Sequence, residues 1–230
     1  MGFWVFDPWY LLLVLPAVLL AMIAQFKVQS TFKKYSGVST RGGLTGWDAC
    51  RAIQEANGLN VPIDTVRGSM TDHYDPRDNT IRLSETVGPV ASISAIGVAA
   101  HETGHALQYA QGYWPIKLRS GILPVTQFAS MMAPYLVIAG LLFSYDFLAI
   151  IGLAFFALAV VFQLITLPVE FNASARALRA LDAQGILTEE ELDGAKKVLT
   201  AAAMTYVAAL FVSLMSLLRL VLIVFGRRRD

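Results

Sequence analysis

Two of the three histidines in this chain stand four residues apart in the sequence HETGH, at His101 and His105, with Glu102 beside the first. A helix brings side chains at this spacing onto one face, so both imidazoles can reach one metal ion. Glu102 is turned about 100° from His101 around the helix axis and would lie beside the metal rather than on it. A carboxylate in that place can take a proton from a zinc-activated water and pass it to a leaving amine.

The motif by itself is suggestive and not decisive, because HExxH arises by chance in roughly one chain in a hundred of this length. The competing interpretation is a helix with two packed histidines and a solvated glutamate. A catalytic zinc takes three protein ligands, so a third ligand must come from outside HETGH. The candidates are His73, Asp72, Asp75, Asp146, Glu170 and Asp182.

Composition indicates a membrane protein. The chain is 56% hydrophobic and 15% charged, against roughly 25% charged in soluble domains. Four apolar blocks come close to the roughly 20 residues that a spanning helix needs. They are residues 9–26, 125–143, 147–167 and 198–225. The 18 basic and 17 acidic residues nearly cancel, which gives no indication of a nucleic-acid partner.

Basic residues predict which side of the membrane carries the site. Lys27, Lys33 and Lys34 follow the first block, and no basic residue precedes it. By the positive-inside rule, the segment from 27 to about 124 faces the cytoplasm, and these lysines also argue for an anchor rather than a cleaved signal peptide. The C-terminal RRRD (227–230) disagrees with this orientation, because these basic residues would lie outside the cell if the last block spans the membrane. We expect the site on the cytoplasmic face of a bacterial-type cytoplasmic membrane.

The remaining elements follow from capping and turn signals. We expect strands at 61–67, 68–73 and 80–83. We expect helices from Thr45 to about Asn57, at 90–111 and from Pro168 to Gly185. A capping box at Thr188 and Glu191 is expected to begin the helix that leads into the last apolar block. The fold class is therefore a mainly α membrane protein with about four transmembrane helices. We expect one domain (1–230), with a small α+β zincin-like catalytic portion formed by about 27–124 and 168–197.

Topology favours Glu170 as the third ligand. The second and third blocks form a transmembrane hairpin, so the chain returns at about 167 to the side that carries HETGH. Glu170 is the first charged residue after that return, whereas Asp146 lies at the opposite end of the hairpin. A glutamate in the first turn of a helix also has a structural explanation, since the helix dipole stabilises it by about 0.5 kcal/mol.

Three segments together resemble a known family. GSMTDHYDPRDNTIRLS, GVAAHETGHALQY and LPVEFNASARAL are similar to the membrane zinc metallopeptidases of the YugP type (zinc peptidase family 2), and the resemblance covers nearly the whole chain. It implies a gluzincin related in layout to HtpX-like proteases, with Zn²⁺ held by His101, His105 and Glu170, and with Glu102 as general base. Gluzincins usually carry an aspartate four residues after the glutamate ligand. Ser174 stands there instead, so its role in orienting a histidine is weaker.

Residues near HETGH in this scheme have two interpretations each. His73 or Tyr74 can donate a hydrogen bond to the tetrahedral intermediate, with the strand beside them pairing with an extended peptide. Asp75 and Asp78 are better explained as caps of a turn. Arg176 can polarise a carbonyl near the zinc or bind a lipid phosphate, and the lipid is favoured.

Five further residues have simpler expected roles. Trp4, Trp9 and Trp114 lie close to predicted span ends, where interfacial anchoring is expected. Gln108 continues the metal helix and is interpreted as a packing or cleft-lining residue. Cys50, the single cysteine, excludes an internal disulfide and is expected to pack as a small residue.

The predicted function is a zinc metalloendopeptidase that cleaves a polypeptide at the bilayer surface. Its expected substrates include membrane proteins, and its expected partners include a regulatory membrane protein. The alternative is a non-catalytic membrane adaptor with a structural zinc site, but such sites are closed by four protein ligands and we find three. A transporter ranks last. It would need polar residues within the spans, and the first three blocks hold little beyond Thr126, Gln127 and Gln163.

Overall fold

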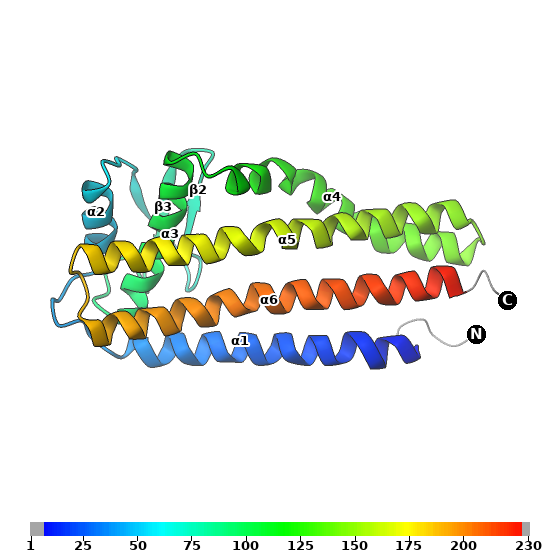
Figure 1. Cartoon of the computed structure of the whole chain (residues 1–230), viewed down its shortest axis with the longest axis horizontal. Helices are drawn as coiled ribbons and strands as arrows, with labels where there is room; N and C mark the ends of the chain where they lie inside the picture. The colour runs from blue at the N-terminus through cyan, green and yellow to red at the C-terminus, as the bar shows by residue number, and fades with distance from the viewer. Residues whose placement is uncertain (1–6, 227–230) are drawn as a thin grey trace. The chain divides into compact units, whose positions relative to one another are not determined.

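The computed structural model describes residues 7–226, so Trp4 and the C-terminal RRRD lie outside the described residues. Within this range, four helices are long and apolar enough to cross a membrane. They are α1 (Leu15–Ser36, preceded by the π-helical segment η1, Tyr10–Val14), α4 (Trp114–Leu142), α5 (Asp146–Ala183) and α6 (Glu189–Gly226) (Figure 1). Together with a small three-stranded sheet, they confirm the predicted mainly α membrane fold.

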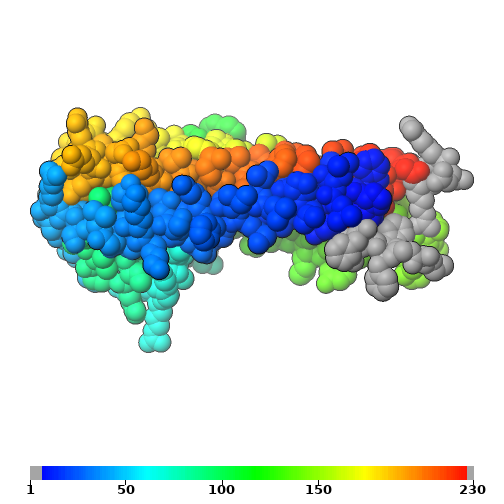
Figure 2. All heavy atoms as spheres, turned by 90° about the horizontal axis from the view of Figure 1, so that it is seen from below, coloured from blue at the N-terminus to red at the C-terminus, as the bar shows by residue number. Residues whose placement is uncertain are grey.

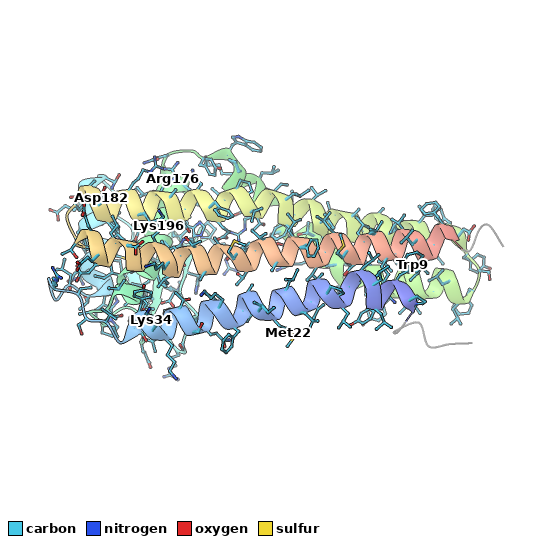
Figure 3. The ribbon with its side chains drawn as sticks, turned by 60° about the horizontal axis from the view of Figure 1, so that its bottom comes forward. Trp9, Met22, Lys34, Arg176, Asp182 and Lys196 are labelled. Carbon is cyan, nitrogen blue, oxygen red and sulfur yellow. The ribbon has the colours of Figure 1, made fainter. Side chains whose placement is uncertain are left out.

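The large apolar side chains of α1 are exposed. Leu19, Met22 and Phe26 are 50%, 62% and 72% exposed. Figure 2 shows side chains of α1 (blue) at the surface of this face, and Figure 3 shows Met22 pointing outward. Side chains of this kind belong in the hydrocarbon of a bilayer, which has room for a helix of about 20 residues.

Contacts divide the described chain into two compact units. The first contains Leu118–Leu167 together with the described residues up to Gln25 and from Thr205 onward. The second contains Phe26–Lys117 and Pro168–Met204.

Glycines let α4 and α5 pack closely within the first unit. A Cβ added to Gly140 would lie 2.4 Å from the backbone nitrogen of Ala149, and one added to Gly152 would lie 2.8 Å from that of Val137. Small residues of this kind allow helix backbones to approach in a membrane, where apolar burial alone does not hold helices together.

Arg219 of α6 has an acidic partner in the same unit. Its Nε donates to Asp7 Oδ2 at 2.8 Å, and its guanidinium lies 5.3 Å from the centroid of the Tyr10 ring. Pairing lowers the cost of placing a charge near the apolar part of a bilayer.

In the second unit, α2 (Gly46–Ala56) forms as predicted. Thr45 is the N-cap: its hydroxyl accepts from the Asp48 amide, and the Asp48 carboxylate accepts from the Thr45 amide at 2.9 Å. This reciprocal capping box satisfies two backbone donors at the helix start. Gly58, with a φ of +63°, follows the end of the helix in the left-handed conformation that favours glycine.

The sheet has the order β1-β3-β2, with β1 (Ile63–Val66) parallel and β2 (His73–Asp75) antiparallel to β3 (Thr80–Ser84). The predicted strand at 68–73 is wrong, because pairing begins only at His73. Gly68 and Met70 have φ values of +107° and +58°, and the Thr71 hydroxyl donates to the Arg67 carbonyl. These left-handed residues turn the chain where an extended strand was expected.

The HETGH helix, α3 (Ile93–Ala110), is buried on more than one side. The core has two clusters of buried residues, and α3 contributes to both. Ile96, Ala100 and Leu107 belong to a cluster with residues of α2, α5 and α6. Ala95, Ala99 and Ala106 belong to a second cluster with Cys50 and residues of the sheet. A helix packed on several sides needs small and apolar residues around most of its circumference, as this sequence has.

The predicted helix start at Pro168 is wrong, because α5 runs without a break from Asp146 to Ala183 through that proline. Proline removes one backbone hydrogen bond and normally ends or bends a helix. Here Val169, Ala173, Ala177 and Leu181 are fully buried at helical spacing beyond it, and this packing stabilises the continuation. Glu170 therefore lies inside a helix, so stabilisation by the dipole of a first turn does not explain it.

Candidate metal centre

Three potential metal ligands converge in the second unit. His101 and His105 project from α3, and Glu170 projects from α5. Glu170 Oε2 lies 3.3 Å from His101 Nε2 and 3.6 Å from His105 Nε2, and the ligand atoms of all three lie within 4.8 Å of one another. Among the described residues, this is the one group of three or more His, Cys, Asp or Glu side chains so arranged.

Two of these separations are close to those in a tetrahedral zinc site. Bonds of about 2.0–2.1 Å at tetrahedral angles place neighbouring ligand atoms about 3.3 Å apart. The two nitrogen-to-oxygen distances, 3.3 and 3.6 Å, are close to that edge length. Two imidazole nitrogens and one carboxylate oxygen are also among the donors that zinc prefers.

Gly104, between the two histidines, allows α3 to approach α5. A Cβ added to Gly104 would lie 2.6 Å from the carbonyl oxygen of Ala173 and 3.3 Å from its carbonyl carbon. Both are backbone atoms, so a side chain at this position would push the helices apart. The glycine of HETGH is therefore what lets Glu170 come within reach of the histidines.

Glu102 lies beside this cluster and is buried, with 8% of its surface exposed. Its Oε2 accepts a hydrogen bond from the backbone amide of Tyr74 at 2.9 Å. Burial raises the pKa of Glu102, and the nearby carboxylates of Glu170 and Asp72 add to the rise, against the opposing effects of His101 and the Tyr74 amide. A carboxylate with a raised pKa is a stronger base than one in water.

The side chains of the other predicted site residues in β2 have partners of their own. His73 Nδ1 lies 2.8 Å from the Thr71 carbonyl oxygen, and the Tyr74 hydroxyl donates to Asn79 Oδ1 at 2.7 Å. The part of Tyr74 that contacts the site is its backbone amide. Asp75 pairs with Arg77 at 2.7 Å, in agreement with its interpretation as a turn residue.

Both histidines have partners on the ring nitrogen away from Glu170. Ser174 Oγ lies 3.2 Å from His101 Nδ1, which is the contact expected of the residue four positions after Glu170. Gln108 Oε1 lies 3.0 Å from His105 Nδ1. Gln108 was expected only to pack or to line a cleft, although its spacing of three residues from His105 on one helix was a signal for this contact.

Arg176 is part of the same polar group and extends from α5, as Figure 3 shows. Its Nε donates to Asn172 Oδ1 at 2.7 Å, one guanidinium nitrogen donates to Gln111 Oε1, and its guanidinium lies 5.7 Å from the centroid of the Tyr113 ring. Nothing in the sequence had indicated Asn172, since its contacts depend on how α5 packs against α3.

Comparison with known proteins gives two matches that cover nearly all of the chain. Residues 10–225 match the model of the family described as “Putative neutral zinc metallopeptidase”. The chain is also 50% identical over 222 residues to “Putative membrane protease YugP” of Bacillus subtilis (strain 168), an alignment that covers 96% of this chain and 99% of that relative. No solved structure matches the chain.

Proposed function

The chain belongs to the zinc metallopeptidase family that these matches define, and on that premise we propose that it is a zinc-dependent membrane endopeptidase. In this proposal His101, His105 and Glu170 hold the zinc ion. Glu102 is the general base, and peptide bonds are hydrolysed on the cytoplasmic side of the membrane.

One observation carries the proposal: three zinc-type donors converge from two helices beside a buried carboxylate that does not belong to the donor set. A purely structural arrangement of two histidines and a glutamate has no need for a second buried carboxylate next to it. Burial of Glu102 has a cost in stability, and general-base catalysis gives that cost a reason.

Zinc bound to this donor set would polarise a substrate carbonyl and lower the pKa of a water molecule to about 7. Glu102 then accepts the proton of the attacking water and passes it to the leaving amine. The Tyr74 amide holds Glu102 Oε2 at 2.9 Å, so Oε1 is the oxygen that we assign to proton transfer. Because Glu102 is buried, few competing water molecules reach it.

The substrate is a polypeptide in this proposal, and β2 is where we expect it to bind. β2 lies at an edge of the sheet, and its Tyr74 amide is next to the general base. An extended peptide can pair with an exposed strand edge through its backbone. His73 and Tyr74 are both proposed as oxyanion donors, and Tyr74 would have to release its hydroxyl from Asn79 Oδ1, because its amide already donates to Glu102.

The alternative, a membrane adaptor with a structural zinc site, is less favoured. Structural sites are closed by four protein ligands, and the described residues bring three donors together here. The two hypotheses differ in their need for Glu102, because an adaptor does not need a general base.

Glu102→Gln tests the proposal. The substitution keeps the size of the side chain and removes the base, so we expect zinc content unchanged and hydrolysis of an unfolded protein substrate abolished in detergent. Glu85→Gln is the matched control, since Glu85 is exposed and lies outside the site. Cleavage by Glu102→Gln at the wild-type rate would overturn the mechanism, and absence of cleavage by the zinc-loaded wild type would favour the adaptor.

A further inference from the structure

Gln108 is a fully buried polar side chain whose two amide hydrogens and amide oxygen all have partners. It is 0% exposed. Its Nε2 donates to the Val169 carbonyl oxygen at 2.8 Å and to Asn172 Oδ1 at 2.9 Å. Its Oε1 lies 3.0 Å from His105 Nδ1. Both amide hydrogens and the amide oxygen therefore have partners, as a buried side chain requires.

The direction of these hydrogen bonds is fixed from the far end of the network. Arg176 can only donate, so the Asn172 atom that faces its Nε at 2.7 Å must be an acceptor oxygen. That same oxygen accepts from Gln108, and the Val169 carbonyl can also only accept. A reversed Gln108 amide would place its oxygen against two oxygens, so Oε1 has to face His105.

The consequence falls on the tautomer of His105. A glutamine oxygen accepts and cannot donate, so neutral His105 must carry its proton on Nδ1. The lone pair is then on Nε2, which is the nitrogen that faces Glu170 at 3.6 Å. Only this tautomer can bind a metal from that nitrogen.

We propose that Gln108, oriented by Asn172 and Arg176, is a positioning residue that sets the tautomer and ring orientation of His105 for zinc binding. The inference rests on the proposed function, in which His105 is a zinc ligand. The same glutamine also ties α3 to the Val169 carbonyl, next to Glu170 in the chain, so it positions two ligands at once.

His101 has no comparable constraint. Its Nδ1 faces Ser174 Oγ at 3.2 Å, and a hydroxyl can donate or accept. Either tautomer of His101 satisfies that contact, so the serine does not select the metal-binding one. The two ligand histidines are therefore controlled unequally, and His105 is the preorganised one.

The test is the tautomer of His105 in the metal-free full-length chain, measured by NMR of the ring nitrogens after ¹⁵N-histidine labelling in detergent. The chain has three histidines, so His73→Gln and His101→Gln suffice to assign the signals. We expect the His105 proton on Nδ1 in the wild type and a mixture of tautomers in Gln108→Met. Zinc affinity, from competition with a chelator, is expected to fall ten- to a hundredfold in Gln108→Met, the range typical of partners that orient metal ligands.

Asn172→Asp is the conservative variant, because a carboxylate oxygen still accepts from Gln108 and Arg176. It should retain the Nδ1 proton and zinc affinity within about threefold, whereas Asn172→Leu should lose both. This comparison keeps the proposal testable if Gln108→Met does not fold. A wild-type His105 with its proton on Nε2, or an Asn172→Leu chain that retains tautomer and affinity, would overturn it.

The tautomer is measured without metal and without turnover, so the result is separable from the proposed function. If the tautomer and affinity change as expected and the wild type does not cleave protein, the endopeptidase proposal fails and the role of Gln108 stands. If the wild type cleaves and the tautomer is indifferent to Gln108 and Asn172, the role of Gln108 fails and the endopeptidase proposal stands.

Discussion

The close approach of α3 and α5 at Gly104 makes the candidate metal centre sensitive to a single added methyl group. In Gly104→Ala, the new Cβ would lie 2.6 Å from the Ala173 carbonyl oxygen. The obstacle is backbone, so no side-chain rotation relieves it. To reach even 3.0 Å, the helices must separate by about 0.4 Å at this point.

The expected loss in stability follows from two opposing effects. Overpacking a buried contact costs about 1–3 kcal/mol, and replacing glycine by alanine inside a helix returns about 1 kcal/mol. We therefore expect a net loss of up to about 2 kcal/mol in the free energy of unfolding. Zinc binding should be more sensitive than stability to this displacement, because zinc–ligand distances can deviate by only about 0.2 Å from their usual values. Displacing Glu170 by twice that amount should weaken zinc binding at least about tenfold.

Gly97→Ala is the matched control on the same helix. Its Cβ would lie 3.6 Å from the nearest atom, the Ala195 Cβ, which is ordinary van der Waals contact. It should keep wild-type zinc affinity and lose no stability. The assays are chelator competition for zinc and thermal unfolding followed by circular dichroism in detergent. If Gly104→Ala equals Gly97→Ala in both measurements, the close helix contact is not what places Glu170.

Three further outcomes are expected. Glu170→Ala should lose most bound zinc, and full retention by elemental analysis would remove Glu170 from the ligand set. The Arg77 guanidinium holds the pKa of Asp75 below its ordinary value, so this pair stabilises the fold above about pH 4 and loses that effect as the pH falls. The difference in Tm between wild type and Asp75→Asn should therefore shrink below about pH 4. A difference that stays constant with pH would contradict this. Cys50 is fully buried and burial raises its pKa to about 12, so a water-soluble maleimide should label it only after denaturation, and rapid labelling of the folded chain would refute the packing.

Local signals predicted the elements that depend on neighbouring residues. The helix start at Thr45 and the capping box at Thr188 form as the sequence indicates, because each is completed within one helical turn. The four apolar blocks become helices because a bilayer-spanning backbone must satisfy its own hydrogen bonds. The predicted strand at 68–73 failed for a local reason that was hard to see, since Met70 adopts a left-handed conformation that its residue type rarely has.

The spacing of HETGH by itself determined that His101 and His105 share a helix face, since helix geometry alone requires it. Tertiary structure decided the rest. Packing of α5 on α3 carries the helix through Pro168 and brings Glu170 to the histidines at Gly104. It also gives His105 a glutamine whose direction is set by residues more than sixty positions away. Such contacts depend on which backbones approach and how closely, and that information is spread over the whole core rather than written at any one site.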